Sequence, residues 1–226
     1  MKIILFGATG MVGQGALREC LLDPAVEEVL AVGRSPTGQN HSKLRELVHS
    51  DFFDWSAHEA QLAGYDACLF CLGVSSVGMK EDAYRHLTYD LTMSIATMLV
   101  RLNPGMTFIY VTGQGTDSSE QGSSMWARVK GKTENDLRKL PFKAAYMFRP
   151  GVIQPLHGIK SKTAWYQAIY TIAAPLFSLL KAVAPKYLTT TEWIGRAMIS
   201  VARSGYPNSI LETDDINRIG RAVAEK

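Results

Sequence analysis

The chain has 226 residues, 46% hydrophobic and 20% charged, which is long and apolar enough to bury the core of one large globular domain. Its formal net charge of +3 comes from 24 basic and 21 acidic residues spread evenly, which argues against a nucleic-acid-binding surface. Three cysteines, an odd number, favour a reducing compartment, and MKIILFGATG lacks the features of a cleaved export signal, so we expect a cytoplasmic protein.

The first predicted unit is a strand at residues 2–6 that leads into the turn GATGMVG and then into a helix over Met11–Leu22. The turn places Gly7, Gly10 and Gly13 between strand and helix. A pyrophosphate site needs glycines there for a tight turn, for close approach of backbone amides, and for packing of the helix on the sheet. This setting predicts nucleotide binding, whereas a glycine-rich turn without a ligand leaves three glycines unexplained.

Apolar runs then alternate with helical stretches. Further strands are predicted at residues 28–32, 44–48, 67–72, 106–112 and 143–148. Further helices are predicted at Asp54–Leu62, Lys80–Arg101 and Ser123–Leu140. This alternation predicts an α/β fold with a parallel sheet between two layers of helices.

The pattern changes after Arg149-Pro150-Gly151. The apolar stretch TAWYQAIYTIAAPLFSLLKAVAP at residues 163–185 is interrupted by polar residues and proline, so we interpret it as helices over a substrate cleft or as a homo-oligomer surface, in preference to membrane contact. TTTEWIGRAMISVARSG then predicts a helix with a threonine cap and Glu192 in its first turn. SILET predicts a last strand, and DDINRIGRAV a closing helix.

Other site chemistries are disfavoured. Cys68 and Cys71 have redox or zinc spacing, but they lie in an apolar run whose strand geometry points them to opposite faces, so we expect buried packing. The five histidines show no metal-ligand spacing, and no metal site is predicted. GVSSV at residues 73–77 lacks the second glycine of a hydrolase nucleophile elbow.

GATGMVG resembles the G-x-x-G-x-x-G fingerprint of the short-chain dehydrogenase/reductase superfamily, in its extended and atypical branches, and the likeness extends from Met1 to about Val152. It implies a Rossmann-type, doubly wound sheet and a nicotinamide cofactor. HSDFFD resembles the segment whose acidic residue contacts adenine, CLG the turn after the fourth strand, and FRPGVI the turn after the sixth. The cofactor-binding residues implied by these motifs are Gly7, Thr9, Gly10, Met11, Val12, Gly13, Asp51, Phe52, Cys71, Leu72, Gly73, Pro150, Gly151 and Val152.

The form of the cofactor follows from charge at the end of the second strand. A carboxylate there would bind the ribose 2′-hydroxyl of NAD, but this sequence has VGRSP instead. Arg34 offers a planar cation suited to a 2′-phosphate, with Ser35 as a further donor. We therefore expect NADP(H), with NAD(H) as the alternative cofactor. The alternative interpretation of Arg34 is an ordinary solvated loop arginine.

The superfamily's catalytic pattern is incomplete. It has a Tyr-x-x-x-Lys helix after a strand that ends in Ser or Thr, and here Thr112 and Lys130 match while Trp126 occupies the tyrosine position. The resemblance implies that Lys130 binds the nicotinamide ribose and that Thr112 orients the carbonyl. An indole does not ionise usefully near neutral pH, so Trp126 cannot replace a phenol as general acid.

Three hypotheses follow. A substitute acid keeps the enzyme active; or Lys130 holds the cofactor while Trp126 stacks on it in a non-catalytic sensor or scaffold; or Trp126 is ordinary helix packing and Lys130 a solvated side chain. The candidate acids are Tyr84, His157, Tyr166, or a water held by Thr112 and Ser119, Ser123 or Ser124.

The sequence thus predicts one Rossmann-type domain, residues 1–226, with a cofactor-binding part at 1–152 and a small, mostly helical C-terminal part at 153–226 that shapes the substrate pocket or an interface. The expected activity is oxidoreductase or epimerase chemistry on a small carbonyl or hydroxyl compound. Side chains that we place near the substrate are His157, Lys160, Tyr166 and Gln167.

Overall fold

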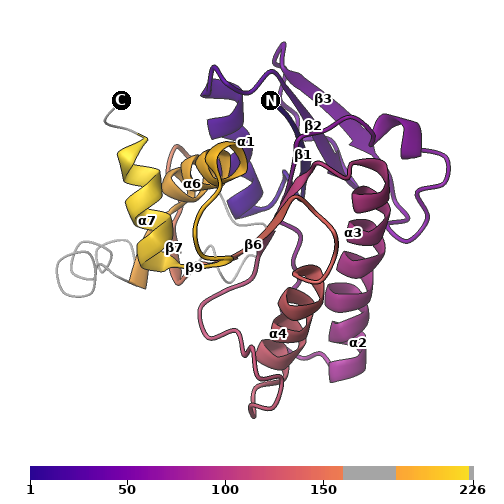
Figure 1. Ribbon diagram of the computed structural model, residues 1–226, viewed down its shortest axis with the longest axis vertical. Coiled ribbons are helices and arrows are strands. Elements are labelled where there is room, and N and C mark those ends of the chain that lie inside the picture. Colours follow the sequence, from indigo (N-terminus) through magenta and orange to yellow (C-terminus); the bar gives the residue numbers. More distant parts are fainter. Residues whose placement is uncertain (160–186, 224–226) are drawn as a thin grey trace.

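The computed structural model describes residues 1–159 and 187–223, and its centre is a seven-stranded sheet (Figure 1). All neighbouring strands run parallel, in the order β3-β2-β1-β4-β5-β6-β9. The strands are β1 Lys2–Phe6, β2 Glu28–Gly33, β3 Leu44–Val48, β4 Ala67–Phe70, β5 Thr107–Val111, β6 Ala144–Arg149 and β9 Ile210–Glu212. The strand order reverses between β1 and β4, and ligands of open α/β sheets bind at such a switch point.

Helices cover both faces of the sheet. Helices α1, α6 and α7 lie on one side, and α2, α3 and α4 lie on the other (Figure 1). Their bounds are α1 Met11–Leu22, α2 Glu81–Arg85, α3 Leu91–Leu102, α4 Met125–Leu137, α6 Thr191–Ser204 and α7 Thr213–Ala222. The predicted three-layer, doubly wound parallel sheet with C-terminal helices is confirmed.

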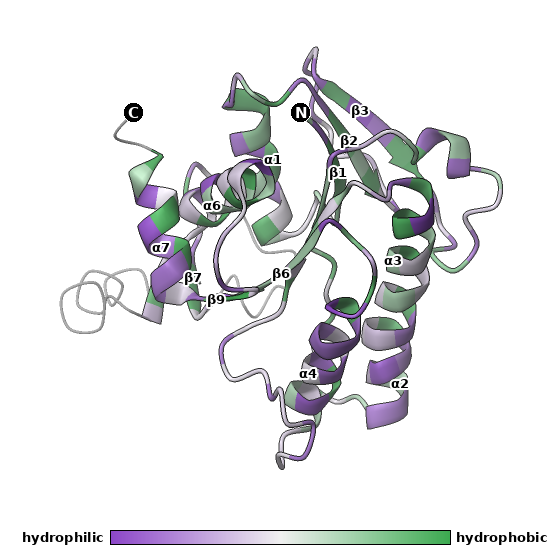
Figure 2. Ribbon diagram, viewed as in Figure 1, coloured by the Kyte–Doolittle hydropathy of each residue, from purple (hydrophilic) through white to green (hydrophobic). Residues whose placement is uncertain are grey.

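Strand alternation divides the core into two clusters. Ile3 and Leu5 pack with α1 and α6 on one face, whereas Ile4 and Phe6 pack with α3 on the other. Figure 2 shows hydrophobic residues concentrated in the central strands and mostly hydrophilic residues in α4. A sheet buried on both faces requires apolar residues at successive positions, which is why the strands read as continuous apolar runs.

Two predicted helices differ in the structure, and one small sheet was not predicted. The helix expected at Asp54–Leu62 is only a 3-10 turn at Glu59–Gln61. Local hydrogen bonds of 2.8 Å from Trp55 Nε1 to the Phe52 carbonyl and 3.0 Å from Ser56 N to Asp54 Oδ1 replace helical bonds there. The helix expected at Lys80–Arg101 is present, but a π-helical turn at His86–Asp90 separates α2 from α3.

The third difference is a second sheet that sequence did not predict, in which β7 (Val152–Gln154) pairs in parallel with β8 (Leu188–Thr190). Residue 190 then caps α6 as predicted, since Thr190 Oγ1 accepts a 3.0 Å hydrogen bond from Trp193 N. The apolar segment at 163–185 lies outside the described residues. None of the helices within 1–159 and 187–223 is long and apolar enough to cross a membrane.

The contact between α1 and α6 includes buried charge. Glu19 is 4% exposed, and its Oε2 accepts a 3.0 Å hydrogen bond from Nε of Arg196. Arg196 also pairs at 2.9 Å with Glu192, which in turn bonds His157 at 2.5 Å. These pairs join α6 to α1 and to His157, in the loop after β7.

Candidate nucleotide-binding site

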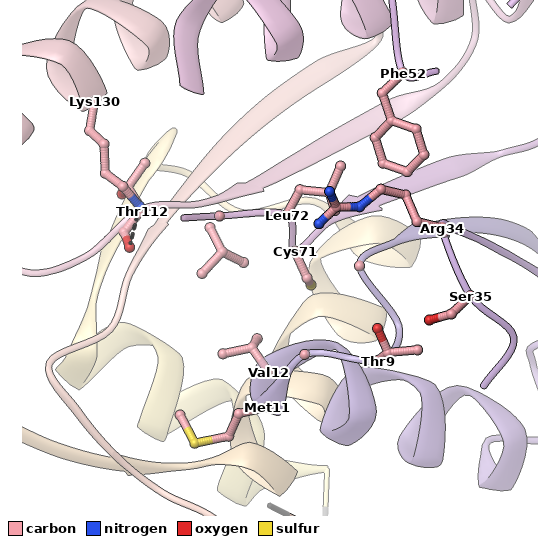
Figure 3. A pocket seen from close by; sticks show the side chains of 15 residues that line it. Thr9, Met11, Val12, Arg34, Ser35, Phe52, Cys71, Leu72, Thr112 and Lys130 are labelled. Carbon is pink, nitrogen blue, oxygen red and sulfur yellow. Dashed lines mark hydrogen bonds between the residues drawn. The ribbon is translucent and has the colours of Figure 1, made fainter. Parts of the chain in front are cut away.

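A cavity of about 420 Å³ opens at the carboxyl ends of β1, β2, β4 and β5 (Figure 3). Most of the predicted cofactor-binding residues line it together. The lining residues are Gly7, Thr9, Gly10, Met11, Val12, Gly33, Arg34, Ser35, Phe52, Cys71, Leu72, Gly73, Val111, Thr112 and Lys130. The sequence motifs therefore converge on one cavity at the topological switch point.

The three glycines of the turn meet different demands. Gly7 has a φ of +80°, and a Cβ there would lie 2.8 Å from the Cys71 carbonyl oxygen; at Gly13 it would lie 2.1 Å from the Gly7 carbonyl oxygen. Both are therefore required by the protein's own packing. At Gly10 the nearest protein atom would be 3.4 Å away, an ordinary contact, so packing does not explain that glycine. Because Gly10 lines the cavity, the space left by its missing side chain fits a ligand held close to the backbone.

Helix α1 begins at this cavity in a way that favours an anion. Its N-cap residue is Gly10, so no side chain occupies the free N–H groups of the first turn. The first turn also contains no acidic residue. The positive end of the helix dipole and its unpaired donors are thus directed to the cavity, as a pyrophosphate requires.

One end of the cavity is formed by Arg34, Ser35 and Phe52. Figure 3 shows the side chain of Arg34 beneath the ring of Phe52 and extending toward Leu72, with Ser35 nearby. Arg34 is exposed, and no carboxylate in the described part of the chain pairs with it. This end presents an uncompensated planar cation beside an aromatic ring.

The other end is formed by Thr112 and Lys130 (Figure 3). Lys130 lies on α4, and its Nζ donates a 3.1 Å hydrogen bond to the Thr112 carbonyl oxygen, just after β5. Burial lowers the pKa of Lys130 from its usual 10.5 to about 8, although the nearby Glu134 carboxylate opposes this shift. An ammonium has three donors, so Lys130 keeps N–H groups for a ligand.

A buried ion pair lies behind Thr112. Glu134, one helical turn after Lys130, is fully buried, and Nε of Arg149 donates to both of its carboxylate oxygens at 3.1 Å. Thr112 Oγ1 donates to Glu134 Oε1 at 2.6 Å and approaches the Phe148 carbonyl at 3.2 Å. Arg149 further donates to Ser118 Oγ at 2.6 Å. The Thr112 hydroxyl proton is therefore directed into the protein and away from the cavity.

Trp126 occupies the first turn of α4 and is half-buried. Its ring lies against Gly115, where an added Cβ would be 3.7 Å from Cη2. Unlike Lys130, it is not among the residues that line the cavity. The role of Trp126 at the cofactor stays a prediction.

The candidate substitute acids that the structure describes do not line the cavity. Tyr84 is 2% exposed, and burial raises its pKa. His157, with a φ of +57°, bonds Glu192. Ser119 donates to Asp117 at 2.6 Å, and Ser123 and Ser124 are exposed. Lys160, Tyr166 and Gln167 lie outside the described residues.

Other predicted cofactor residues have structural partners. Asp51 Oδ1 accepts a 2.9 Å hydrogen bond from Phe53 N, so Asp51 holds the turn next to Phe52. Gly151 N donates to Thr213 Oγ1 at 2.8 Å, and the Pro150 carbonyl accepts from Gln114 N at 2.9 Å. None of these residues, nor the exposed Val152, lines the cavity, and their contact with a cofactor stays a prediction.

Sequence reasoning missed Glu134 and Arg149 as parts of this site. The signal was present, since Glu134 follows Lys130 by four residues on one helix face and Arg149 ends a strand next to β5. A charged residue at the end of a buried parallel strand needs a partner, and Glu134 was available. The expected packing of the thiols is consistent with the structure: all three cysteines are free, with Cys68 in one core cluster and Cys71 packed against the other.

Comparisons with solved structures agree on the architecture. A short chain dehydrogenase family protein from Francisella tularensis aligns over 90% of this chain and 91% of its own, with a TM-score of 0.62 and 12% identity. A UDP-N-acetylglucosamine 4-epimerase from Methanobrevibacter ruminantium aligns over 99% of this chain and 81% of its own, with a TM-score of 0.68 and 15% identity. The chain shares its Rossmann-type fold with these two proteins.

Another structure with the superfamily's fold is DesIV, a dTDP-glucose 4,6-dehydratase from Streptomyces venezuelae solved with NAD bound. It aligns over 100% of this chain and 81% of its own, with a TM-score of 0.66 and 16% identity. No protein-family model matches the chain. The chain thus shares the fold of these enzymes without a sequence match strong enough to assign an activity.

Curated relatives correct the expected location. Protein FMP52 of Candida albicans is 26% identical over 214 residues, which cover 91% of this chain and 89% of that protein. Protein fmp52-2 of Aspergillus terreus is 25% identical over 226 residues, 96% of each chain. Both are named as mitochondrial proteins, which contradicts the cytoplasmic expectation. Unpaired cysteines indicate only that thiols stay reduced, and more than one compartment meets that condition.

Proposed function

We propose that this protein is a short-chain dehydrogenase/reductase-like oxidoreductase that binds NADP(H) and acts on a small carbonyl or hydroxyl compound. The observation that carries the proposal is Gly10, which lines the cavity at the start of α1 and whose missing side chain leaves space that the protein does not fill. A pyrophosphate accepting hydrogen bonds from the first turn of α1 would occupy this space.

The two ends of the cavity then receive the two ends of the dinucleotide. Arg34 and Ser35 would bind a 2′-phosphate on the adenosine ribose, beside Phe52. Lys130 and Thr112 would lie at the nicotinamide end. When bound, the nicotinamide supplies or accepts a hydride, and the residues of this chain hold it in place and manage the proton. NAD bound to DesIV supports a nicotinamide cofactor but not the choice of NADP.

Fluorescence titration with NADPH and NADH tests the binding step. Gly10→Ala adds a Cβ that the fold accommodates but that enters the pyrophosphate space, so we expect NADPH affinity to fall at least about tenfold while the melting temperature changes little. Gly105→Ala is the matched control, because a Cβ there meets nothing within 4 Å and Gly105 is not a cavity residue. Equal affinities of the two variants, or no binding by the folded wild-type protein, would refute the proposal.

A non-catalytic NADP(H) sensor or scaffold is the second candidate. Two observations favour it: Trp126 stands at the tyrosine position, and the Thr112 hydroxyl donates its proton to Glu134. Neither of the two hydroxyl groups that usually bind the substrate carbonyl is then available as a donor. Tight NADPH binding without loss of NADPH absorbance on a panel of aldehydes and ketones would support this alternative.

A further inference from the structure

We propose that Nζ of Lys130 is the group that exchanges a proton with the substrate oxygen, taking the role that a tyrosine has elsewhere in this fold. The inference rests on the proposed oxidoreductase function and assigns its acid. It depends on three features of the cavity: where Lys130 lies, where the Thr112 proton is directed, and which other lining groups titrate.

Lys130 has the position that a proton donor needs. Its side chain enters the cavity from α4, and it is tied to the chain by one hydrogen bond of 3.1 Å to the Thr112 carbonyl oxygen. That bond fixes Nζ at the end of β5 and leaves other N–H bonds available. A carbonyl substrate next to a nicotinamide at the Thr112–Lys130 end of the cavity would have an ammonium within reach of its oxygen.

Thr112 is not available as the donor. Its hydroxyl has one proton, and the fully buried Glu134 carboxylate accepts it at 2.6 Å. Arg149 holds that carboxylate in place by donating to both of its oxygens. Turning the Thr112 hydroxyl toward a substrate would break a charge-assisted bond inside the protein, so a ligand can only donate to Thr112 Oγ1.

The remaining lining groups do not transfer protons near neutral pH. Among the described residues that line the cavity, the ionisable side chains besides Lys130 are Arg34 and Cys71. Arg34 stays charged and lies at the opposite end, while burial raises the pKa of Cys71 to about 12. Lys130, whose pKa is about 8, has the value that suits an acid working near neutrality.

Reduction delivers a hydride to the carbonyl carbon and a proton to its oxygen. As the carbonyl carbon accepts a hydride from a reduced nicotinamide, the electron pair of the C=O π bond moves to oxygen. An Nζ–H bond of Lys130 breaks, its proton forms the O–H bond of the alcohol, and its electron pair stays on a neutral amine. Solvent then returns a proton to that amine. In alcohol oxidation the neutral amine accepts the proton instead.

Direct titration tests this assignment without turnover. The protein labelled with ¹⁵N at its lysine Nζ atoms, with Lys130→Arg to assign the signal, should show Lys130 losing its proton between about pH 7 and 9. A Lys130 pKa at or above about 10 would overturn the proposal.

Kinetics with 4-nitrobenzaldehyde and saturating NADPH give the second measurement. We expect the reduction rate to be constant below about pH 8 and to fall above it. Lys130→Arg keeps the charge but not a transferable proton, so its rate should fall on the order of 10²- to 10⁴-fold. Methylamine should partly restore the rate of Lys130→Ala, which a purely structural lysine would not allow.

Lys132→Arg is the matched control, because Lys132 lies on the same helix, pairs with Asp136 and does not line the cavity. Its rate should stay within about threefold of wild type. A loss of 10²-fold or more in Trp126→Phe, which removes the indole N–H, would assign the donor to Trp126 and overturn the proposal. NADPH binding without aldehyde reduction would also overturn it while leaving nucleotide binding intact. Absence of NADPH binding would instead refute the proposed function itself.

Discussion

Thr112 and Glu134 are joined by a 2.6 Å hydrogen bond that connects the candidate site to the buried Glu134–Arg149 ion pair. Glu134→Gln keeps the shape of the side chain but leaves Arg149, 8% exposed, with only the more distant carboxylate of Glu212 at 3.5 Å. Removing one partner of a buried pair strands the other charge, so we expect the free energy of unfolding to fall by about 3–5 kcal/mol in urea denaturation. Glu59→Gln, which breaks the surface pair with Arg101, should cost less than about 1 kcal/mol. Equal losses in the two variants would contradict this role for Glu134.

Lys130 should make stability depend on pH. Its folded-state pKa of about 8 lies below the usual 10.5, so between these values the unfolded chain binds more protons and stability rises with pH. Below about pH 8 both states are protonated and the full cost of burying the ammonium applies. Lys130→Met removes that cost, so the stability of the variant relative to wild type should be most favourable at pH 7 and decline by pH 10. Urea unfolding at both pH values measures this, and a difference that does not change with pH would contradict the lowered pKa.

Arg34 should determine the choice between NADP and NAD. If its guanidinium binds the 2′-phosphate, Arg34→Ala should weaken NADPH binding by about 10- to 150-fold, the range of a charged hydrogen-bonded contact, and leave NADH within about threefold. Arg203→Ala, an exposed arginine on α6, serves as the control for net charge. Equal effects on both cofactors would show that Arg34 does not read the phosphate.

The central parallel sheet could be predicted from the sequence because each signal for it is local. Continuous apolar runs, the φ of +80° that favours glycine at Gly7, and the contact between Gly13 and the Gly7 carbonyl oxygen each depend on only a few neighbouring residues. The pairing of β7 with β8 could not be predicted, because each strand has only three residues and the paired residues are more than 30 positions apart in the sequence. A propensity pattern contains no information on such a pairing.

The site was predicted less completely than the fold, for a related reason. Thr112 and Lys130 could be identified because they match a motif of the superfamily that the sequence resembles, a strand ending in Ser or Thr followed by a helix with the lysine. The direction of the Thr112 hydroxyl depends on Glu134, and the position of Glu134 depends on Arg149, one strand away. The sequence does not show such a chain of contacts. A carbonyl-orienting role for Thr112 therefore follows from the motif, but the direction of its hydroxyl group in the structure does not favour that role.

Cys71 lines the cavity but should be unreactive. Burial raises its pKa to about 12, so at pH 8 only about one thiol in ten thousand is ionised. We expect iodoacetamide to label Cys71 at least about 1000-fold more slowly than free cysteine, as measured by mass spectrometry of digested protein. Labelling of all three cysteines after denaturation is the control. Rapid labelling of Cys71 in the native protein would contradict its raised pKa.

Gly131 should be indispensable for the contact between α4 and the loop before it. A Cβ at this buried helical position would lie 1.7 Å from the Asp117 carbonyl oxygen, so the loop that includes Asp117 and Ser118 must move. Alanine gains up to about 1 kcal/mol of helix propensity over glycine, whereas overpacking of this severity costs about 3 kcal/mol or more, so the clash decides the sign. Gly131→Ala should therefore destabilise the protein by at least about 2 kcal/mol in urea unfolding. It should also weaken NADPH binding, because Ser118 contacts Arg149 behind Thr112. Gly105→Ala, with open space at its Cβ, should change neither property, and an equally stable Gly131→Ala protein would show that this loop is not held against α4.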